Sequence, residues 1–203
     1  MTLLAFHGDP NIKAKYLARV RAHGKADEIV KGQYWRNGKG CAVGCTIHSG
    51  EHAAYEPEIG FPEALAHLED VIFEGMVNGD SQEWPERFLD AAEPGADLSR
   101  VQWQFLHWLL TDETVNPGIN HPLVKDAVAQ CAAVLELPMR GEPIDESAAR
   151  SAARSAARSA ASAARSAASA ASAASAASAA YKRMADKLIE LMEAVKPDEG
   201  SAA

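Results

Sequence analysis

The chain has 203 residues and a formal net charge of −8, with 28 acidic and 20 basic side chains. An acidic excess of this size gives no field that would recruit phosphates, so the composition argues against a nucleic-acid-binding protein. No apolar run approaches the roughly 20 residues that cross a bilayer, and the first residues lack the basic and apolar segments of a signal peptide. Three cysteines form no paired disulfide framework, so we expect a cytoplasmic protein that does not bind membranes.

The first predicted helix begins at Asp9 and Pro10, because aspartate caps a helix start and proline fits its first turn. Its apolar stripe consists of Ile12, Tyr16, Leu17 and Val20. Gly24 weakens this helix, and we expect the turns that follow to end at Gly32.

Residues 33–60 are rich in glycine and aromatic residues and show no long hydrophobic period, so we expect a loop. The "NGKG" stretch at 37–40 combines glycines, which admit a close ligand, with one positive charge. Aromatic rings beside it suit a flat ligand, so the loop predicts a site for a small anionic molecule such as a nucleotide. The predicted ligand-binding residues are Tyr34, Trp35, Lys39, Gly40 and Tyr55. The alternative, that these rings are core residues, stays open.

The same loop carries Cys41, Cys45, His48 and His52 at intervals of 4, 3 and 4 residues. A thiolate with a histidine base would make a cysteine nucleophile, and Lys39 would help to lower the pKa of the thiol. Two of the four residues could also bind Zn²⁺, but four ligands on one straight helix cannot surround a metal ion. The third interpretation is that both cysteines are small buried side chains, and we expect no cofactor.

Residues 61–76 predict the clearest helix, with an apolar stripe of Leu65, Leu68, Val71, Ile72 and Met76. Shorter helices are expected after Asp80, Asp97 and Pro122. Their inward-facing residues would be Trp84, Phe88, Leu89, Val101, Phe105, Trp108, Leu109, Val124, Ala127, Val128, Cys131 and Val134. No segment alternates long enough to indicate a sheet, so the predicted fold class is all-α.

Residues 1–140 are predicted to form the compact helical domain, and a polar turn at 141–146 ends it. Residues 147–203 then predict one long Ala/Ser-rich helix and a short tail, because only Ala, Ser and Arg occur from Ser147 to Ala180. Alanine has the highest helix propensity, and a helix over most of this range would be about 75 Å long.

The C-terminal segment continues with apolar residues every three or four positions, which is the spacing of a coiled coil. These residues are Tyr181, Met184, Leu188, Leu191 and Val195. We therefore expect the helix to join copies of the chain into a homo-oligomer. The alternative is that it packs on its own domain.

The sequence from Tyr34 to Gly75, followed by a C-terminal SAA-type repeat, resembles a family of uncharacterised bacterial and bacteriophage-encoded proteins. The resemblance extends over nearly the whole chain, and its most specific part is the "NGKGCAVGCT" motif at 37–46. It implies no catalytic residues, because no activity of that family is established. A phage-linked distribution implies a role in conflict between phage and host, for example by sequestering a nucleotide signal.

The sequence thus favours a cytosolic homo-oligomer that binds a small anionic ligand through the 33–60 loop. One alternative is a cysteine-dependent enzyme that uses Cys41 or Cys45 with His48 or His52. Another is a structural or protein-binding module without a ligand.

Overall fold

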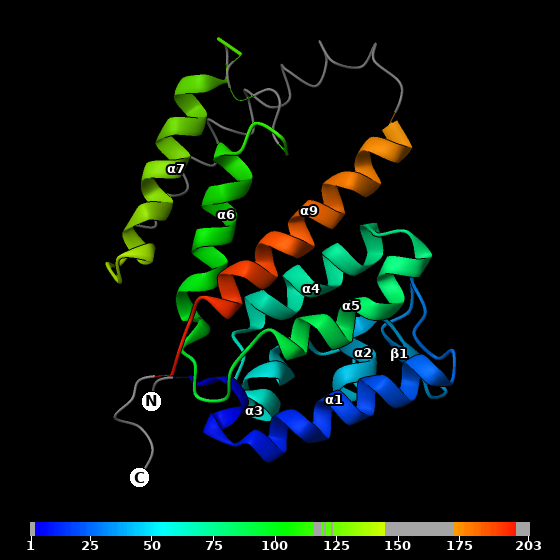
Figure 1. Cartoon of the computed structure of the whole chain (residues 1–203). Helices are drawn as coiled ribbons and strands as arrows, with labels where there is room; N and C mark the ends of the chain where they lie inside the picture. The colour runs from blue at the N-terminus through cyan, green and yellow to red at the C-terminus, as the bar shows by residue number, and fades with distance from the viewer. Residues whose placement is uncertain (1–2, 116–118, 120, 123, 145–172, 198–203) are drawn as a thin grey trace. The chain divides into compact units, whose positions relative to one another are not determined.

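The computed structural model describes residues 3–115, 119, 121–122, 124–144 and 173–197. Within them the chain is predominantly helical, as predicted, and the one sheet has two short antiparallel strands. The α-helices are α1 (Pro10–Lys25), α2 (Ala42–Ile47), α3 (Tyr55–Ile59), α4 (Glu63–Gly75), α5 (Asn78–Asp90), α6 (Val101–Thr111), α7 (Lys125–Met139) and α9 (Ala173–Glu193), which Figure 1 labels. Short 3-10 helices are η1 (Ala5–Gly8), η2 (His52–Ala54) and η3 (Leu98–Arg100).

The chain divides into two compact units, residues 1–99 with 181–203, and residues 100–180. The C-terminal part of α9 thus groups with the first hundred residues, and the predicted domain of residues 1–140 stays a prediction. The alanine-serine-arginine repeat from 147 to 172, for which a long helix is predicted, lies outside the described residues.

The first helix forms as its sequence predicts. The Asp9 side chain accepts a hydrogen bond from the Asn11 backbone N–H at 2.8 Å, which caps α1 at its start. Tyr16, Leu17 and Val20 of the predicted stripe are buried, and α1 packs against α2 and α5.

Aromatic rings fill the core of the first unit. Phe61 lies at its centre, with ring centroids 5.0 Å from Phe6, 5.8 Å from Phe88 and 6.4 Å from Tyr55. Trp84 packs beside Phe88 and donates its indole N–H to the backbone carbonyl of Glu69 at 3.0 Å. Buried rings of this size contribute much of a domain's hydrophobic stabilisation, so this core fixes α4 and α5 relative to the preceding loop.

The clearest predicted helix, α4, forms where the sequence predicts it, and Leu65, Ile72 and Met76 of the predicted stripe are buried. Val71, expected inside, is 55% exposed, whereas Glu69, Ile72 and Phe73 are fully buried. The buried face is therefore shifted at Val71 only, and it carries the carboxylate of Glu69 into the core.

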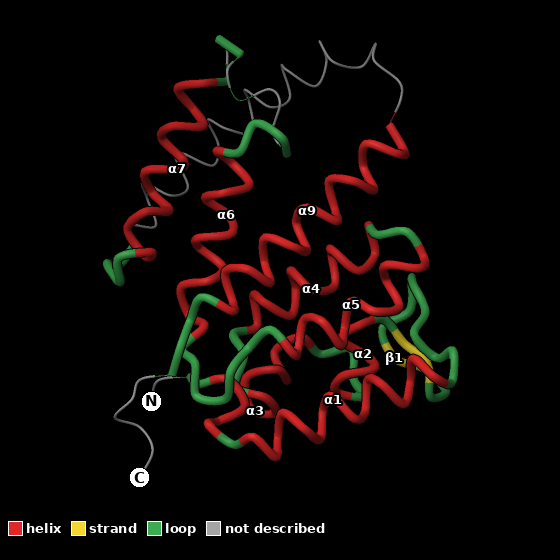
Figure 2. The backbone as a smooth tube through the Cα atoms, in the orientation of Figure 1, coloured by secondary structure: helices red, strands yellow, loops and turns green. Residues whose placement is uncertain are grey.

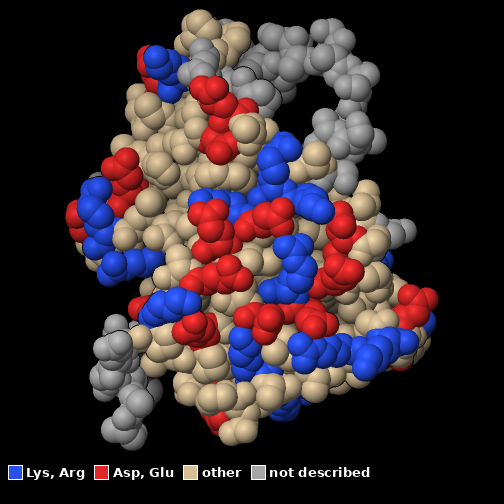
Figure 3. All heavy atoms as spheres, viewed as in Figure 1, with Lys and Arg blue, Asp and Glu red and all other residues tan. Residues whose placement is uncertain are grey.

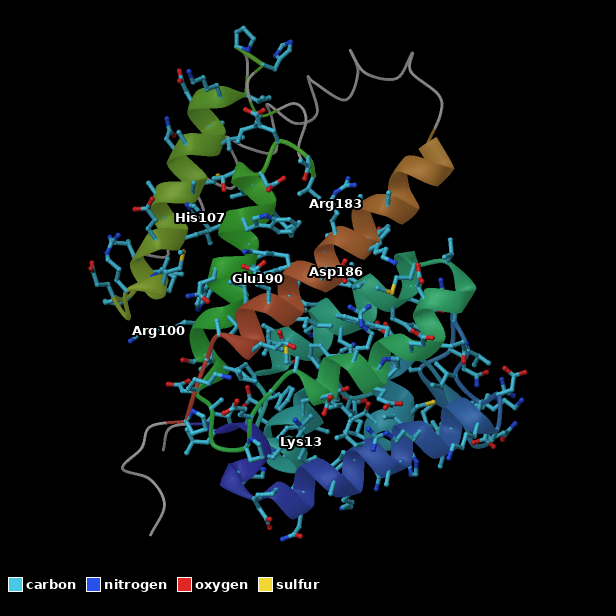
Figure 4. All side chains as sticks on the ribbon, in the orientation of Figure 1. Lys13, Arg100, His107, Arg183, Asp186 and Glu190 are labelled. Carbon is cyan, nitrogen blue, oxygen red and sulfur yellow. The ribbon has the colours of Figure 1, made fainter. Side chains whose placement is uncertain are left out.

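The C-terminal part of α9 packs within its own unit. Ala185, Leu188 and Met192 are fully buried, and the Tyr181 ring lies so close to Gly75 of α4 that it would overlap a Cβ there. Asp186 accepts a hydrogen bond from Arg87 of α5 at 2.8 Å, and Figure 4 labels it on the helix. Leu188 is one of the coiled-coil positions that predict homo-oligomerisation, and it is fully buried within the single chain. The other two fully buried positions, 185 and 192, do not belong to that pattern.

In the second unit, α6 packs along α7. Val101 and Phe105 of α6 are buried, while Trp108 is half-buried and donates to Asp112 at 2.9 Å. His107, labelled in Figure 4, lies 3.8 Å from Glu136 of α7. These contacts hold α6 against α7.

Charges of both signs lie side by side on the face shown in Figure 3. Two ion pairs join α1 to α5, Lys13 with Asp90 at 3.4 Å and Arg21 with Glu86 at 2.8 Å. Exposed pairs of this kind contribute little stability, about 1 kcal/mol or less each. Among the described helices, none combines the length and the apolar composition that a membrane crossing requires.

Candidate functional site

The 33–60 segment is a folded unit that begins with a hairpin. Strands β1 (Trp35–Arg36) and β2 (Lys39–Gly40) pair antiparallel beside α2, and Figure 2 shows them in yellow. Asn37 and Gly38 form the turn with φ of 52° and 80°. Positive φ at both central residues is the geometry of a tight two-residue hairpin, for which Asn-Gly is the preferred sequence. The sequence pattern does not predict this sheet.

Two glycines of the motif allow the backbone to approach itself. A Cβ atom at Gly40 or at Gly44 would overlap the backbone carbonyl oxygen of Tyr34. The N–H of Cys41 donates to that same oxygen at 3.1 Å. These glycines therefore fix α2 against β1, a role that accounts for them without a ligand. Lys39 donates to the backbone carbonyl of Asp27 at 3.3 Å.

Both cysteines of the motif are buried: Cys45 lies within α2, and Cys41 directly precedes it. The Cys45 thiol donates to the carbonyl of Gly40 at 3.3 Å, and burial raises its pKa to about 12. Burial likewise raises the pKa of Cys41, and the nearby carboxylates of Asp70 and Glu69 raise it further. Since the thiolate is the nucleophile, this environment opposes cysteine catalysis at neutral pH.

On one side of the hairpin lies what we call the histidine cluster: Glu28, His23, His48 and Trp35. Nε2 of His23 lies 2.8 Å from Nε2 of His48, and Nδ1 of His23 lies 2.6 Å from Oε2 of Glu28. The His48 ring stacks on Trp35, with centroids 4.4 Å apart and planes 11° from parallel. Desolvation and then the charge of Arg19 lower the pKa of His48, which favours the neutral ring.

A second group, here named the acidic cluster, consists of His52, Tyr55, Glu69 and Asp70. Tyr55 donates its hydroxyl hydrogen to Oε2 of Glu69 at 2.5 Å, and both residues are fully buried. Burial raises the pKa of the Glu69 carboxyl to about 8, against the opposing effect of the Tyr55 hydrogen bond. Burial also raises the pKa of Tyr55 well above its usual range.

Three polar atoms of the acidic cluster have no hydrogen-bond partner within the described protein: Nε2 of His52, Oε1 of Glu69 and Oδ1 of Asp70. His52 and Asp70 face each other at 3.5 Å, with side chains 10% and 13% exposed. His52 also stacks on His67, with centroids 4.1 Å apart. Buried polar groups are nearly always satisfied, so unpartnered atoms here mark a position where another group can bind.

The acidic cluster adjoins a pocket of about 270 Å³. Its lining residues are Gly32, Gln33, Tyr34, Asp70 and Glu74. The Tyr34 ring is 54% exposed, and Glu74 accepts a hydrogen bond from the Gly32 N–H at 2.8 Å. The pocket thus combines one accessible aromatic ring with two carboxylates.

The predicted ligand-binding residues do not share one site. Tyr34 lines the pocket and Tyr55 is buried with its hydroxyl on Glu69, whereas Trp35 belongs to the histidine cluster. Lys39 is exposed on strand β2, and Gly40 of the same strand is buried.

The predicted cysteine and histidine set separates in the same way, since His48 and His52 join different clusters. Across the described ranges, no group of three or more His, Cys, Asp and Glu side chains is placed to hold a metal ion. Cys41, Cys45, His48 and His52 therefore do not assemble into the metal site that their spacing allowed.

Sequence reasoning missed His23, Glu28, Asp70 and Glu74, and it offers Glu69 only as a possible further metal ligand. A signal for Glu69 was present, because it stands four residues after Leu65 and three before Ile72, in the middle of an apolar stripe. No comparable signal marks the pairing of His23 with His48, which requires α1 to pack against α2.

Comparison with known proteins adds no relative. No family model matches the chain, and neither a curated protein nor a solved structure matches it. The resemblance to bacterial and bacteriophage-encoded proteins therefore remains a prediction from the motif.

Proposed function

We propose that this protein binds a small organic cation in the pocket between residues 32–34 and α4. The observation that carries the proposal is the carboxylate of Asp70, which lines the pocket and whose Oδ1 has no partner among the described residues. Asp70 is 13% exposed, and its described polar neighbours are the Cys41 thiol and the His52 ring at 3.5 Å, so a further donor or positive charge at Oδ1 would compensate its buried charge. An ammonium or guanidinium group bound in the pocket would supply both.

The aromatic wall supports the same class of ligand. Tyr34 presents an exposed ring to the pocket, and a cation over a tyrosine face gains about 0.5–1 kcal/mol at an accessible site. Glu74 adds a second carboxylate, although one of its oxygens already accepts from Gly32. The volume of about 270 Å³ suits a compact ligand rather than a large cofactor.

This proposal reverses the charge of the ligand that the sequence predicts. A nucleotide or other anion in the pocket would face Asp70 and Glu74, and like charges repel. The predicted cation of the loop, Lys39, is not among the lining residues. An anion-binding surface elsewhere on the loop stays a prediction without a supporting contact.

Isothermal titration calorimetry with methylguanidinium, tetramethylammonium, putrescine and AMP tests the proposal. We expect binding of at least one cation, loss of that binding in Asp70→Asn, and weakening in Tyr34→Leu. Glu63→Gln is the matched control, because Glu63 is a half-exposed carboxylate on the same helix outside the pocket. Binding of AMP alone, abolished by Lys39→Ala, would instead support the anionic ligand.

The other predicted functions have less support. Burial and the raised pKa values of Cys41 and Cys45 weigh against the cysteine-dependent enzyme. Homo-oligomerisation through the C-terminal helix loses support where Leu188 is buried in the single chain. Cytoplasmic location, a role in conflict between phage and host, and a purely structural module stay predictions.

A further inference from the structure

Two histidine side chains of the first unit point their Nε2 atoms at each other. His23 lies in the last turn of α1 and His48 directly follows α2 in a left-handed conformation, with φ of 56°. The two Nε2 atoms are 2.8 Å apart, and the ring planes are 82° from parallel. Neutral imidazoles can hold this distance only if one Nε2 carries the proton and the other accepts it.

The back of the His23 ring is held by a carboxylate. Oε2 of Glu28 lies 2.6 Å from Nδ1 of His23, which assigns the proton to Nδ1 and leaves the Nε2 lone pair free to point at His48. A carboxylate on the far nitrogen is the usual outer-shell partner of a metal-binding histidine, because it fixes the tautomer and makes the ring more basic.

The second ring is held by stacking and by the packing of the helices. Trp35 covers one face of His48 at 4.4 Å and meets the edge of His23 at 5.4 Å. Arg19 of α1 donates to the backbone carbonyl of Thr46 at 2.8 Å, which ties α1 to the end of α2. The nitrogen pair is therefore set by two helices and a strand rather than by loose side chains.

The separation of the nitrogens matches that of two ligands on one metal ion. Two nitrogens at about 2.0 Å from a metal lie roughly 2.9 Å apart at a right angle and about 3.3 Å apart at the tetrahedral angle. The observed 2.8 Å is nearer the right-angled arrangement, which Cu²⁺ prefers with nitrogen ligands. His48 is exposed, so water molecules have access to complete the coordination shell.

We propose that His23 and His48 form a two-nitrogen binding site for a divalent transition-metal ion, with Cu²⁺ as its best occupant and Glu28 as the outer-shell partner. Binding moves no net proton, since the ring of His48 stays neutral while its proton shifts from Nε2 to Nδ1. The metal replaces the hydrogen bond between the two rings. The charge of Arg19 opposes a bound cation and that of Glu28 favours it, so we expect a selective rather than a very tight site.

Titration of the full chain, without any added histidine tag, with Cu²⁺ tests the proposal by calorimetry and by electron paramagnetic resonance. We expect one site per chain whose spectrum shows two nitrogen ligands. Each single variant, His23→Gln or His48→Gln, should bind Cu²⁺ as weakly as the double variant that carries both substitutions. Glu28→Gln should weaken binding about 10- to 100-fold, as the loss of an outer-shell partner does.

His67→Gln is the matched control, because His67 is 57% exposed and stacks on His52 rather than on the pair. Thermal unfolding of each metal-free variant shows whether it still folds, and the nitrogen count in the wild-type spectrum does not depend on any variant. A wild-type spectrum with fewer than two nitrogens would overturn the proposal. So would copper binding that survives in the His23→Gln, His48→Gln double variant or disappears only in His67→Gln.

Discussion

The histidine cluster and the acidic cluster contain the same kinds of side chain in opposite surroundings. Each combines imidazole, carboxylate and an aromatic ring, and each is anchored by the α2 segment or the residues just after it. In the histidine cluster, Glu28 pairs with His23, and His23 with His48, so each ring finds a partner near solvent. In the acidic cluster, Glu69 is fully buried and three polar atoms lack partners.

The difference shows how burial decides what one set of groups can do. Near solvent, the rings of His23 and His48 are joined through the same Nε2 atoms that could bind a metal ion. In the interior, burial raises the pKa of Glu69 and so favours its protonated form, because the ionised carboxylate has lost its hydration. The pocket lies at the boundary, where Asp70 keeps some contact with water.

The substitution Gly44→Ala tests the frame that the two clusters share, and we expect it to have the largest effect. The new Cβ would overlap the Tyr34 carbonyl, which is backbone and cannot turn aside. Separation of α2 from β1 would disturb Trp35 and Tyr34 together, at a cost of about 3 kcal/mol or more. Chemical denaturation measures this loss.

Gly79→Ala is its control, because Gly79 lies in α5 with open space around its Cα. There alanine should be neutral or stabilising by up to about 1 kcal/mol, since it favours the helix. Equal destabilisation by the two substitutions would show that the close approach at Gly44 does not hold the clusters.

Glu69→Gln changes the acidic cluster alone, and its effect should depend on pH. The pKa of Glu69 is raised to about 8 in the folded chain, so the folded state retains a proton that the unfolded state releases above about pH 4.3. Stability therefore falls as pH rises from about 4.3 to 8, by up to about 1.4 kcal/mol per unit, and then levels off. The glutamine variant should lack this fall and be the more stable protein at pH 8.

Denaturant unfolding at pH 5, 6, 7 and 8 measures the slope for both proteins. Glu83→Gln, a change of an exposed carboxylate on α5, should leave the slope as it is in the wild type. A wild type whose stability does not fall over this range would show that Glu69 is ionised in the core.

Much of the fold could be predicted from the sequence because local patterns determine it. The cap at Asp9 and the apolar stripe of α1 specify a helix with an inward face, and the structure contains both. The buried face of α4 was harder to predict, because Val71 and Glu69 exchange their expected places. Hydropathy assigns a carboxylate to the surface. Burial of Glu69 is tolerable because Tyr55 donates a hydrogen bond to it and because its raised pKa favours the uncharged form.

The site was less predictable because its partners are distant in sequence. His23 and His48 meet through the packing of α1 on α2, and a spacing rule within one segment cannot find such a pair. The sequence predicts that the glycines of "NGKG" admit a ligand, whereas Gly40 and Gly44 admit a neighbouring carbonyl and Asn37-Gly38 makes a turn. Both roles need small residues, and the sequence alone does not distinguish them.

Lys39→Ala should have the smallest effect, and it distinguishes the two explanations of the motif. Lys39 is exposed and makes a long hydrogen bond of 3.3 Å to the Asp27 carbonyl, so its loss should change stability by no more than about 0.5 kcal/mol. Because Lys39 lines neither the pocket nor the nitrogen pair, binding of organic cations and of Cu²⁺ should also persist. Thermal unfolding and the two titrations measure this, with Arg36→Ala on the paired strand as a control for lost surface charge. A nucleotide affinity that disappears in Lys39→Ala and survives in Arg36→Ala would restore the motif as an anion site.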